Sequence, residues 1–288
     1  MAAASLFETE DMAQAGTGNA GAVRPNDNAA RLVAALQTWG PLVALAVLCA
    51  GFALAEPTFA TPENLQTIAS RSAIPLILAV GMTFVILQGS IDLSIEGLMA
   101  ASSLTLALLV LNNRTGMDLG MLGVVAGVGI GAAFGFINGF VVARLRVPSF
   151  MVTLGLWSLT WGVAMLLSAG RPPIIADPLL RAIGLGSTLG LPNVALIALV
   201  VLAIGYVMQN YTRFGRYSYV IGGGEDLARL SGLPVDRYKI LVFTFAGFTA
   251  GLAGVLESAR LGVGHSEIGP GQMFATITAV VIGGTALS

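Results

Sequence analysis

One short polar stretch lies between two long apolar runs and carries side chains that could bind a solute or an ion. Residues 87–96 read LQGSIDLSIE, with apolar residues 75–87 before them and 98–111 after them. Carboxylates are costly in hydrocarbon, since a charge at a bilayer centre costs at least about 2.5 kcal/mol. Such groups must face a cavity or a protein partner, and Gly89 allows a helix break that protein would shield from lipid. A polar turn at the membrane surface is the alternative interpretation.

The composition indicates a polytopic helical membrane protein. Of the 288 residues, 56% are hydrophobic and 10% are charged, whereas soluble domains carry roughly 25% charged residues. The net charge of −1 gives no indication of a nucleic-acid partner. The single cysteine, Cys49, excludes an intrachain disulfide. No cluster of His, Cys and carboxylates has metal-ligand spacing, so we expect an all-α transmembrane bundle without a metal site.

The apolar runs predict eight membrane spans that position the polar stretch. Residues 1–38 have no long apolar run and predict a mobile cytoplasmic tail with a short surface helix near 28–37, whereas residues 39–288 form the transmembrane domain. Thr61 followed by Pro62 is typical of a helix start. Residues 169–193 and 257–272 are expected to be extramembrane loops. The expected spans are 39–55, 61–87, 93–111, 120–142, 150–167, 194–208, 240–256 and 273–287.

Glycine recurs at every fourth residue in the fourth predicted span, at Gly123, Gly127, Gly131 and Gly135. Small residues at this spacing let two membrane helices approach closely, so we expect a packing face here. Asn138 follows on the same span and is a candidate for packing or for lining a pore.

Basic residues favour a cytoplasmic N-terminus, because cytoplasmic loops carry an excess of Lys and Arg. With the N-terminus inside, nine basic residues lie on the inner side and five on the outer side. The inner ones are Arg24, Arg31, Arg144, Arg146, Arg213, Arg216, Arg229, Arg237 and Lys239, and the outer ones are Arg71, Arg114, Arg171, Arg181 and Arg260.

The eighth predicted span stops inside the bilayer, where its last carbonyls would have no partners. We therefore expect a further C-terminal portion of about two spans.

The predicted cytoplasmic loop 210–239 contains a short amphipathic helix. Three glycines at 222–224 precede EDLARLS, and Gly232 and Pro234 follow. Acids in the first turn and a late arginine complement the helix dipole. A helix of about seven residues is unstable alone in water, so its leucines must pack on the membrane domain or on another protein; a surface turn without a partner is the alternative. No Gly-Lys-Ser/Thr follows the glycines, so nucleotide binding is not expected.

Several motifs together resemble the permease subunits of sugar-type ATP-binding-cassette importers, the ribose-transport permease family. The resemblance covers about residues 39–288. Its motifs are Val80–Thr83, Gly89–Ser94, Asn138-Gly139, Arg146–Phe150, Gly215–Tyr217, Ala228–Gly232, Ala259–Leu261 and Ala279–Thr285.

The resemblance implies an importer of several chains in a bacterial inner membrane, with ten spans in each of two permease subunits. Two cytoplasmic ATPase subunits would bind ATP and Mg²⁺, so this chain itself would need no cofactor and perform no covalent chemistry. An external binding protein would deliver the solute. The family's coupling helix, which docks on the ATPase, maps to Glu225, Asp226, Ala228, Arg229, Leu230, Ser231 and Gly232.

The translocation path is expected along the polar stretch and the spans that follow it. Neutral sugars need hydrogen-bonding groups, for which Gln88, Ser90, Ser94, Asn138 and Thr153 are candidates. Asp92 and Glu96 also lie on this path, and they are candidates for holding the broken helix by accepting backbone amides.

Two departures from the family pattern indicate that the cargo could differ from ribose. The family usually has glycine where this chain has Glu96. It commonly has a Glu-Leu-Asp run where this chain has Met273-Phe274-Ala275. Related permeases carry other monosaccharides, polyols and nucleosides.

Two other function classes remain open on the sequence. An ion-coupled secondary transporter would use Asp92 or Glu96 as its proton or sodium site and would need no ATPase. An intramembrane hydrolase would use Ser94 and His265, but the predicted topology places these two residues near opposite faces of the membrane.

Overall fold

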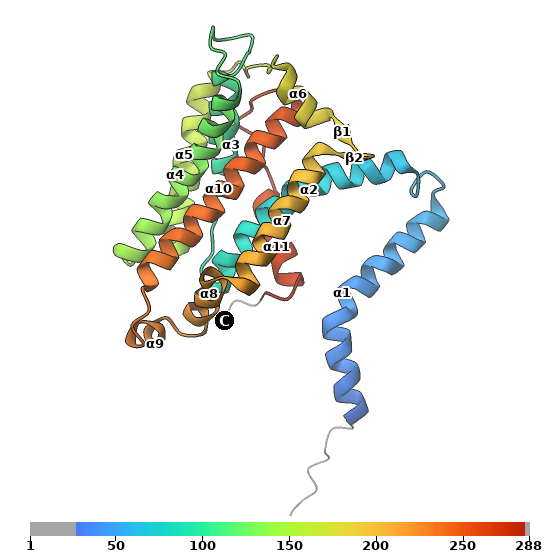
Figure 1. Cartoon of the computed structure of the whole chain (residues 1–288), viewed down its shortest axis with the longest axis vertical. Coiled ribbons are helices and arrows are strands. Elements are labelled where there is room, and N and C mark those ends of the chain that lie inside the picture. The colour runs from blue at the N-terminus through green and yellow to red at the C-terminus, as the bar shows by residue number, and fades with distance from the viewer. Residues whose placement is uncertain (1–26, 286–288) are drawn as a thin grey trace, which may run out of the picture. The chain divides into compact units, whose positions relative to one another are not determined.

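The structure is a computed structural model that describes residues 27–285 (Figure 1). The chain divides into two compact units, 1–50 and 51–288. Helix α1 (Asp27–Ala55), whose last five residues belong to the second unit, is one continuous helix with Pro41 inside it, and it joins the predicted surface helix to the first predicted span. Most of the predicted tail, residues 1–26, lies outside the described residues.

Five helices of the described chain are long and apolar enough to cross a membrane, so the predicted count of eight spans is not confirmed. Three shorter apolar helices account for the difference: residues 39–55 of α1, α3 (Ile95–Leu109) and α11 (Gln272–Ile282). At 1.5 Å per residue, α3 and α11 are about 22 and 16 Å long, less than the roughly 30 Å hydrocarbon core. The five long helices are α2 (Pro62–Leu87), α4 (Met121–Arg144), α5 (Ser149–Ser168), α7 (Asn193–Tyr211) and α10 (Val235–Leu261).

The third predicted span, 93–111, is helical from Ile95 to Leu109. Its helix begins at Ile95 rather than near Leu93, and residues 90–94 before it have no regular secondary structure. Segment 88–94, which joins α2 to α3, therefore interrupts the predicted crossing. We call this segment the polar break. Thr61 caps α2 at its start, as predicted.

A second broken crossing lies where we expected an extramembrane loop at 257–272. The long helix α10 continues to Leu261. Gly264 then packs against Ser103 and Ala107 of α3, and Gly269 packs against Glu96 and Met99. Seven residues separate Glu96 from Ser103 along α3, so the segment descends about 10 Å beside this helix. Residues 262–271 thus re-enter the bundle, and α11 starts at their inner end, beside the start of α3.

The bundle is centred on α10, which packs against α2, α3 and α4 (Figure 1). The predicted glycine ladder is confirmed as a packing face, since its four glycines, Gly123, Gly127, Gly131 and Gly135, are all buried. A Cβ atom on Gly131 would lie 2.4 Å from the carbonyl oxygen of Gly247, and one on Gly135 would lie 2.4 Å from that of Phe243. Backbone therefore meets backbone along the seam between α4 and α10.

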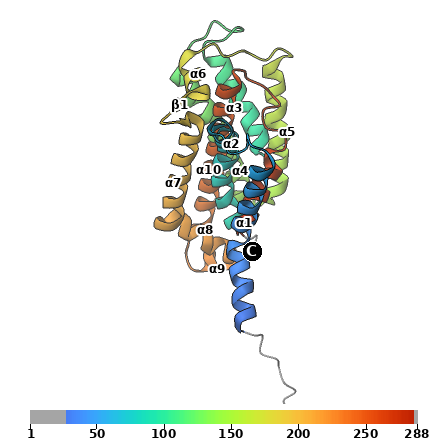
Figure 2. The same cartoon turned by 90° about the vertical axis from the view of Figure 1, so that its right-hand side faces the viewer.

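One end of the bundle gathers α8 (Arg213–Gly223), α9 (Glu225–Leu230), the start of α10 and the loop 145–148 (Figures 1 and 2). We call it the basic end. Arg144 lies 3.7 Å from Asp236, and Arg146 and Asp226 line one cavity. The predicted helix of the loop 210–239 is thus on the same side as the basic loop after α4.

The loops of the opposite end are joined by backbone and side-chain hydrogen bonds. Ile175 pairs with Asn112, and Ile174 with Val263, in isolated β-bridges. Arg114 donates to three carbonyl groups of the segment 167–171. Residues 169–193, predicted as a loop, also contain α6 (Pro178–Leu185), which Asp177 caps, and the two-residue strands β1 (Ser187–Thr188) and β2 (Leu191–Pro192).

Candidate functional site

The polar break holds a buried hydrogen-bonded chain of three predicted path residues. Asp92 Oδ1 accepts the backbone amide of Ser94 at 2.8 Å and its hydroxyl at 2.5 Å. Asn138 of α4 donates to the Ser94 hydroxyl at 2.8 Å. All three residues are 0% exposed, so protein shields this part of the break.

Side chains of α5 bind the backbone that the break leaves without helical partners. Thr153 Oγ1 accepts the amide of Leu93 at 3.0 Å, and Ser149 Oγ accepts the amide of Ile91 at 3.2 Å. An unpaired amide in hydrocarbon costs several kcal/mol. These two hydroxyls therefore fix the extended chain against α5.

Gln88 and Ser90 connect the break to the basic end. Gln88 Nε2 donates to Ser218 Oγ of α8 at 3.2 Å. Ser90 lines a cavity of about 610 Å³ together with Arg146, Asp226 and Lys239. This cavity joins the inner end of the break to the start of α9.

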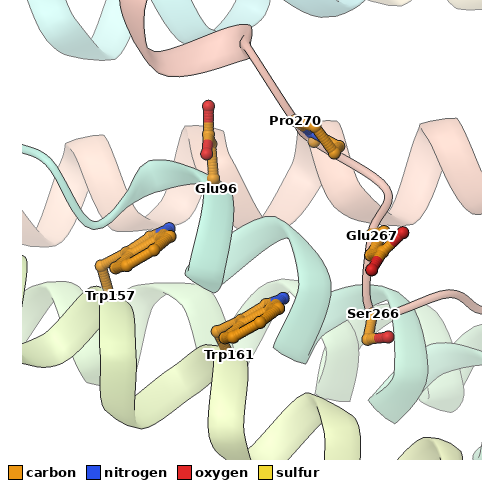
Figure 3. Close-up of a pocket in the computed structure, with 7 residues that line it drawn as sticks. Glu96, Trp157, Trp161, Ser266, Glu267 and Pro270 are labelled. Carbon is orange, nitrogen blue, oxygen red and sulfur yellow. The ribbon is translucent and has the colours of Figure 1, made fainter.

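Glu96 lies apart from the other path residues. Its Oε1 accepts the backbone amide of Met273 at 3.0 Å, which links the first turn of α3 to the first turn of α11. As expected, Asp92 and Glu96 both accept backbone amides. Glu96 also lines a second pocket, of about 350 Å³, with Trp157 and Trp161 of α5 (Figure 3).

The helix α9 presents leucines outward while its alanine anchors it. Ala228 is buried between Ile221 and Val235. Leu227 and Leu230 are 69% and 85% exposed. An isolated helix this short has no stability of its own, so the fold supplies its support from one side and leaves an apolar surface on the other.

An ionic cluster fixes both ends of α9 to α10. Arg229 lies 2.9 Å from Glu225 and 2.7 Å from Asp236, and Lys239 also bonds Glu225. Burial raises the pKa of Glu225, but the hydrogen bonds from Lys239 and Arg229 outweigh burial and lower this pKa below its ordinary value. The stability that Glu225 contributes is therefore present at neutral pH and is lost only as the pH falls through the lowered pKa.

A tight contact joins α8 to the end of α2 directly before the break. A Cβ atom on Gly222 would lie 1.9 Å from the carbonyl oxygen of Leu87, whereas nothing lies within 4 Å of one on Gly223. Only Gly224 separates α9 from α8, so displacement of α9 acts on α8 as well as on α10. The contact at Gly222 therefore connects α9 mechanically to the polar break.

For the importer that the resemblance implies, Gly222→Ala is expected to separate α8 from α2 and to lower the maximum rate of solute uptake at least about tenfold. Overpacking of this kind costs about 1–3 kcal/mol. Gly223→Ala, one residue on, is the matched control and should leave uptake unchanged. Uptake into vesicles that contain each variant, with the amount of inserted protein measured in parallel, checks the prediction. Equal rates for the two variants would contradict it.

Sequence reasoning missed several residues that complete these sites. Ser149 and Ser218 bind the polar break, Asp236 and Lys239 complete the ionic cluster, and Trp157 forms the wall beside Glu96. Single serines within apolar spans form no sequence pattern that marks them as binding residues. The only sequence feature that could have pointed to Trp157 and Trp161 is their four-residue spacing, which places them on one helix face. Ser94 and His265 are not a catalytic pair, because the His265 amide bonds Ser103 at 3.1 Å, over two helical turns beyond Ser94 along α3.

The structure is a bundle of apolar helices with two broken crossings that meet inside it and a short exposed helix at one end, an arrangement consistent with a membrane permease. The family model of the permease component of branched-chain amino acid transport systems matches residues 64–287. The chain belongs to this family.

Three curated relatives show which members of the family this chain resembles in sequence. The ribose import permease protein RbsC of Escherichia coli strain K12 is 39% identical over 86% of this chain and 77% of its own length. The L-arabinose transport system permease protein AraH of the same strain is 32% identical over 86% and 75%. RbsC of Bacillus subtilis strain 168 is 33% identical over 88% and 78%.

These relatives confirm the resemblance to sugar-type importer permeases that the motifs predicted. No solved structure matches the chain.

Proposed function

We propose that this chain is the membrane-spanning permease subunit of an ATP-binding-cassette importer for a monosaccharide or a related small polar solute. The relatives named for ribose and arabinose support this class of cargo. The observation that carries the proposal is α9. It exposes Leu227 and Leu230, is fixed to α10 by ion pairs, and connects through α8 to the polar break.

Transport would proceed by rearrangement of packed helices, without covalent chemistry in this chain. A loaded binding protein would dock on the loops of the opposite end, among them residues 169–193. ATP binding by the partner ATPase would move α9, and α8 would transmit this movement to Gln88 and the end of α2. Because packed interfaces switch between discrete arrangements, the path would open to one side at a time.

The expected assembly has two permease subunits, two cytoplasmic ATPase subunits that hold ATP and Mg²⁺, and an external binding protein. The chain would lie in a bacterial inner membrane with a cytoplasmic N-terminus. The gathering of Arg144, Arg146, Arg229 and Lys239 at the basic end supports this orientation under the positive-inside rule. Co-purification of this chain with an ATPase encoded nearby, and ATP-driven uptake by the reconstituted complex, test the proposal.

An ion-coupled secondary transporter is the second candidate, and one observation favours it. Asp92 Oδ2 is buried without a hydrogen-bond partner among the described residues, as a proton or sodium site would require. Against it, the other oxygen of Asp92 accepts the amide of Ser94, the residue directly before α3, and so has a structural role.

Asp92→Asn separates the two candidates. Asparagine keeps an oxygen that can accept the Ser94 amide but removes the charge that would bind a cation. For the importer we expect uptake to stay dependent on ATP and to change by no more than about tenfold, because asparagine keeps the hydrogen bond and loses only its charge assistance, worth about 1–1.4 kcal/mol. Loss of a pH-dependent uptake that never required ATP would instead establish the secondary transporter.

A further inference from the structure

The pocket beside Glu96 combines features that no motif predicted. Its lining comes from three separate segments: Glu96 from α3, Trp157 and Trp161 from α5, and Ser266, Glu267, Gly269 and Pro270 from the re-entrant segment (Figure 3). The two indole planes are parallel within 1°, with their centroids 5.9 Å apart. Glu267 adds a second carboxylate to the lining.

The pocket lies at membrane depth. Thirteen residues of α3 separate Glu96 from Leu109 at the opposite end, which places Glu96 about 20 Å inside that end. The backbone of Trp157 packs against Gly97, with its carbonyl oxygen 2.7 Å from where a Cβ of Gly97 would be, so this indole is attached at the same level. An ionisable side chain at this depth faces a cavity that holds water rather than lipid.

The lining also sets the chemistry of a ligand. Carboxylate oxygens accept hydrogen bonds and cannot donate them, and one oxygen of Glu96 is used by the Met273 amide. No lysine or arginine lines the pocket among the described residues. A ligand must therefore offer donors to the carboxylates and an apolar face to the indoles. A sugar ring or a linear polyol does both, with hydroxyls on its edges and C–H groups on its face.

We infer that this pocket is a solute subsite on the translocation path, in which Trp157 and Trp161 form the platform and Glu96 accepts hydroxyl groups of a neutral polyhydroxylated solute. The inference rests on the proposed import function and adds the residues that select the cargo. Glu96 stands at the junction of the two broken helices, so a solute bound there would contact both elements whose separation opens the path.

Water access is tested first, in the full importer with Cys49→Ser as the background. Ser266→Cys places a thiol in the pocket, and Ser158→Cys places one on the exposed face of α5, next to Trp157 in sequence. Because only a hydrated thiolate reacts quickly, a membrane-impermeant thiol reagent should label Ser266→Cys about tenfold faster than Ser158→Cys. A saturating pentose or polyol should slow the labelling severalfold. Labelling of Ser266→Cys no faster than the control would overturn the inference, since lipid or protein would then cover the pocket.

Selection of the solute is tested by uptake. Glu96→Gln and Trp157→Ala should each lower the maximum uptake rate about tenfold, while Trp157→Phe retains most of it because a ring face remains. Glu56→Gln and Trp39→Ala are the matched controls and should change nothing. Unchanged uptake by Glu96→Gln and Trp157→Ala would overturn the inference, as would protection of Ser266→Cys by amine-bearing solutes alone.

The experiments distinguish failure of the proposed import function from failure of the proposed subsite. If the Cys49→Ser parent shows no ATP-driven uptake, the proposed import function fails. If the parent transports solute but the pocket variants behave like their controls, only the subsite fails.

Discussion

Gly131→Leu is expected to abolish accumulation of folded protein. A Cβ atom at this position would lie 2.4 Å from the carbonyl oxygen of Gly247 and 2.7 Å from the Cα atom of Gly251. Both contacts are backbone, so no side chain can move aside and α4 must separate from α10. Ordinary overpacking costs about 1–3 kcal/mol, and a leucine forced between two backbones should exceed this range. A monodisperse peak in detergent gel filtration, present for the parent and lost for the variant, is the measurement.

Gly129→Leu is the control, on the same helix and two residues away. Nothing lies within 4 Å of a Cβ atom there, and leucine in contact with lipid has no penalty. This variant should behave like the parent. If both variants elute as monodisperse protein with the same thermal stability, the close seam between α4 and α10 does not exist as described.

Arg229→Glu is expected to remove the ATPase from the purified complex and to stop ATP-driven uptake. The change replaces two ion pairs with three neighbouring carboxylates, at positions 225, 229 and 236. Hydrogen bonds to charged groups contribute about 1.5–3 kcal/mol, so α9 should lose its fixed position and the co-purified ATPase should fall at least about tenfold.

Arg181→Glu makes the same charge change at the opposite end, on α6, and should leave the complex intact. Arg229→Glu/Asp236→Arg restores opposite charges and should recover part of the association. Wild-type levels of bound ATPase and uptake in Arg229→Glu would show that α9 is not where the ATPase docks.

The sequence predicted the helical class, the glycine seam and the short helix of the loop 210–239, because each depends on a local pattern. The four-residue glycine spacing sets one helix face whatever its partner is. Acids, an arginine and flanking glycines mark a short helix within a few residues. Gly224 and Ser231 border α9 close to the predicted limits.

The second broken crossing could not be predicted in the same way. Residues 257–272 contain Arg260, His265 and Glu267, and such polarity favours a loop in water. In the folded chain Ser103 binds the His265 amide, and Glu96 binds the Met273 amide. These partners are more than 150 residues distant in sequence, and only the fold brings them close enough to satisfy a backbone inside the bundle.

The polar break was located correctly, but the partners of its side chains were only partly predictable. Because a carboxylate is costly in hydrocarbon, the sequence indicates that Asp92 must be shielded, but it does not indicate which residues shield it. Asn138 and Thr153, predicted as path residues, are 0% exposed and bind the break itself. Ser90 and Glu96 line cavities, and the role of all four residues in the translocation path stays a prediction.

The docking of α9 on a separate ATPase is the central claim, and cross-linking tests it most directly. In a Cys49→Ser background, Leu230→Cys places a thiol on the exposed side of α9, and Leu189→Cys places one that is 95% exposed at the opposite end. With a short thiol cross-linker in the assembled importer, Leu230→Cys should join this chain to the ATPase subunit and Leu189→Cys should not. A cross-link to the ATPase from Leu189→Cys, with none from Leu230→Cys, would contradict the account.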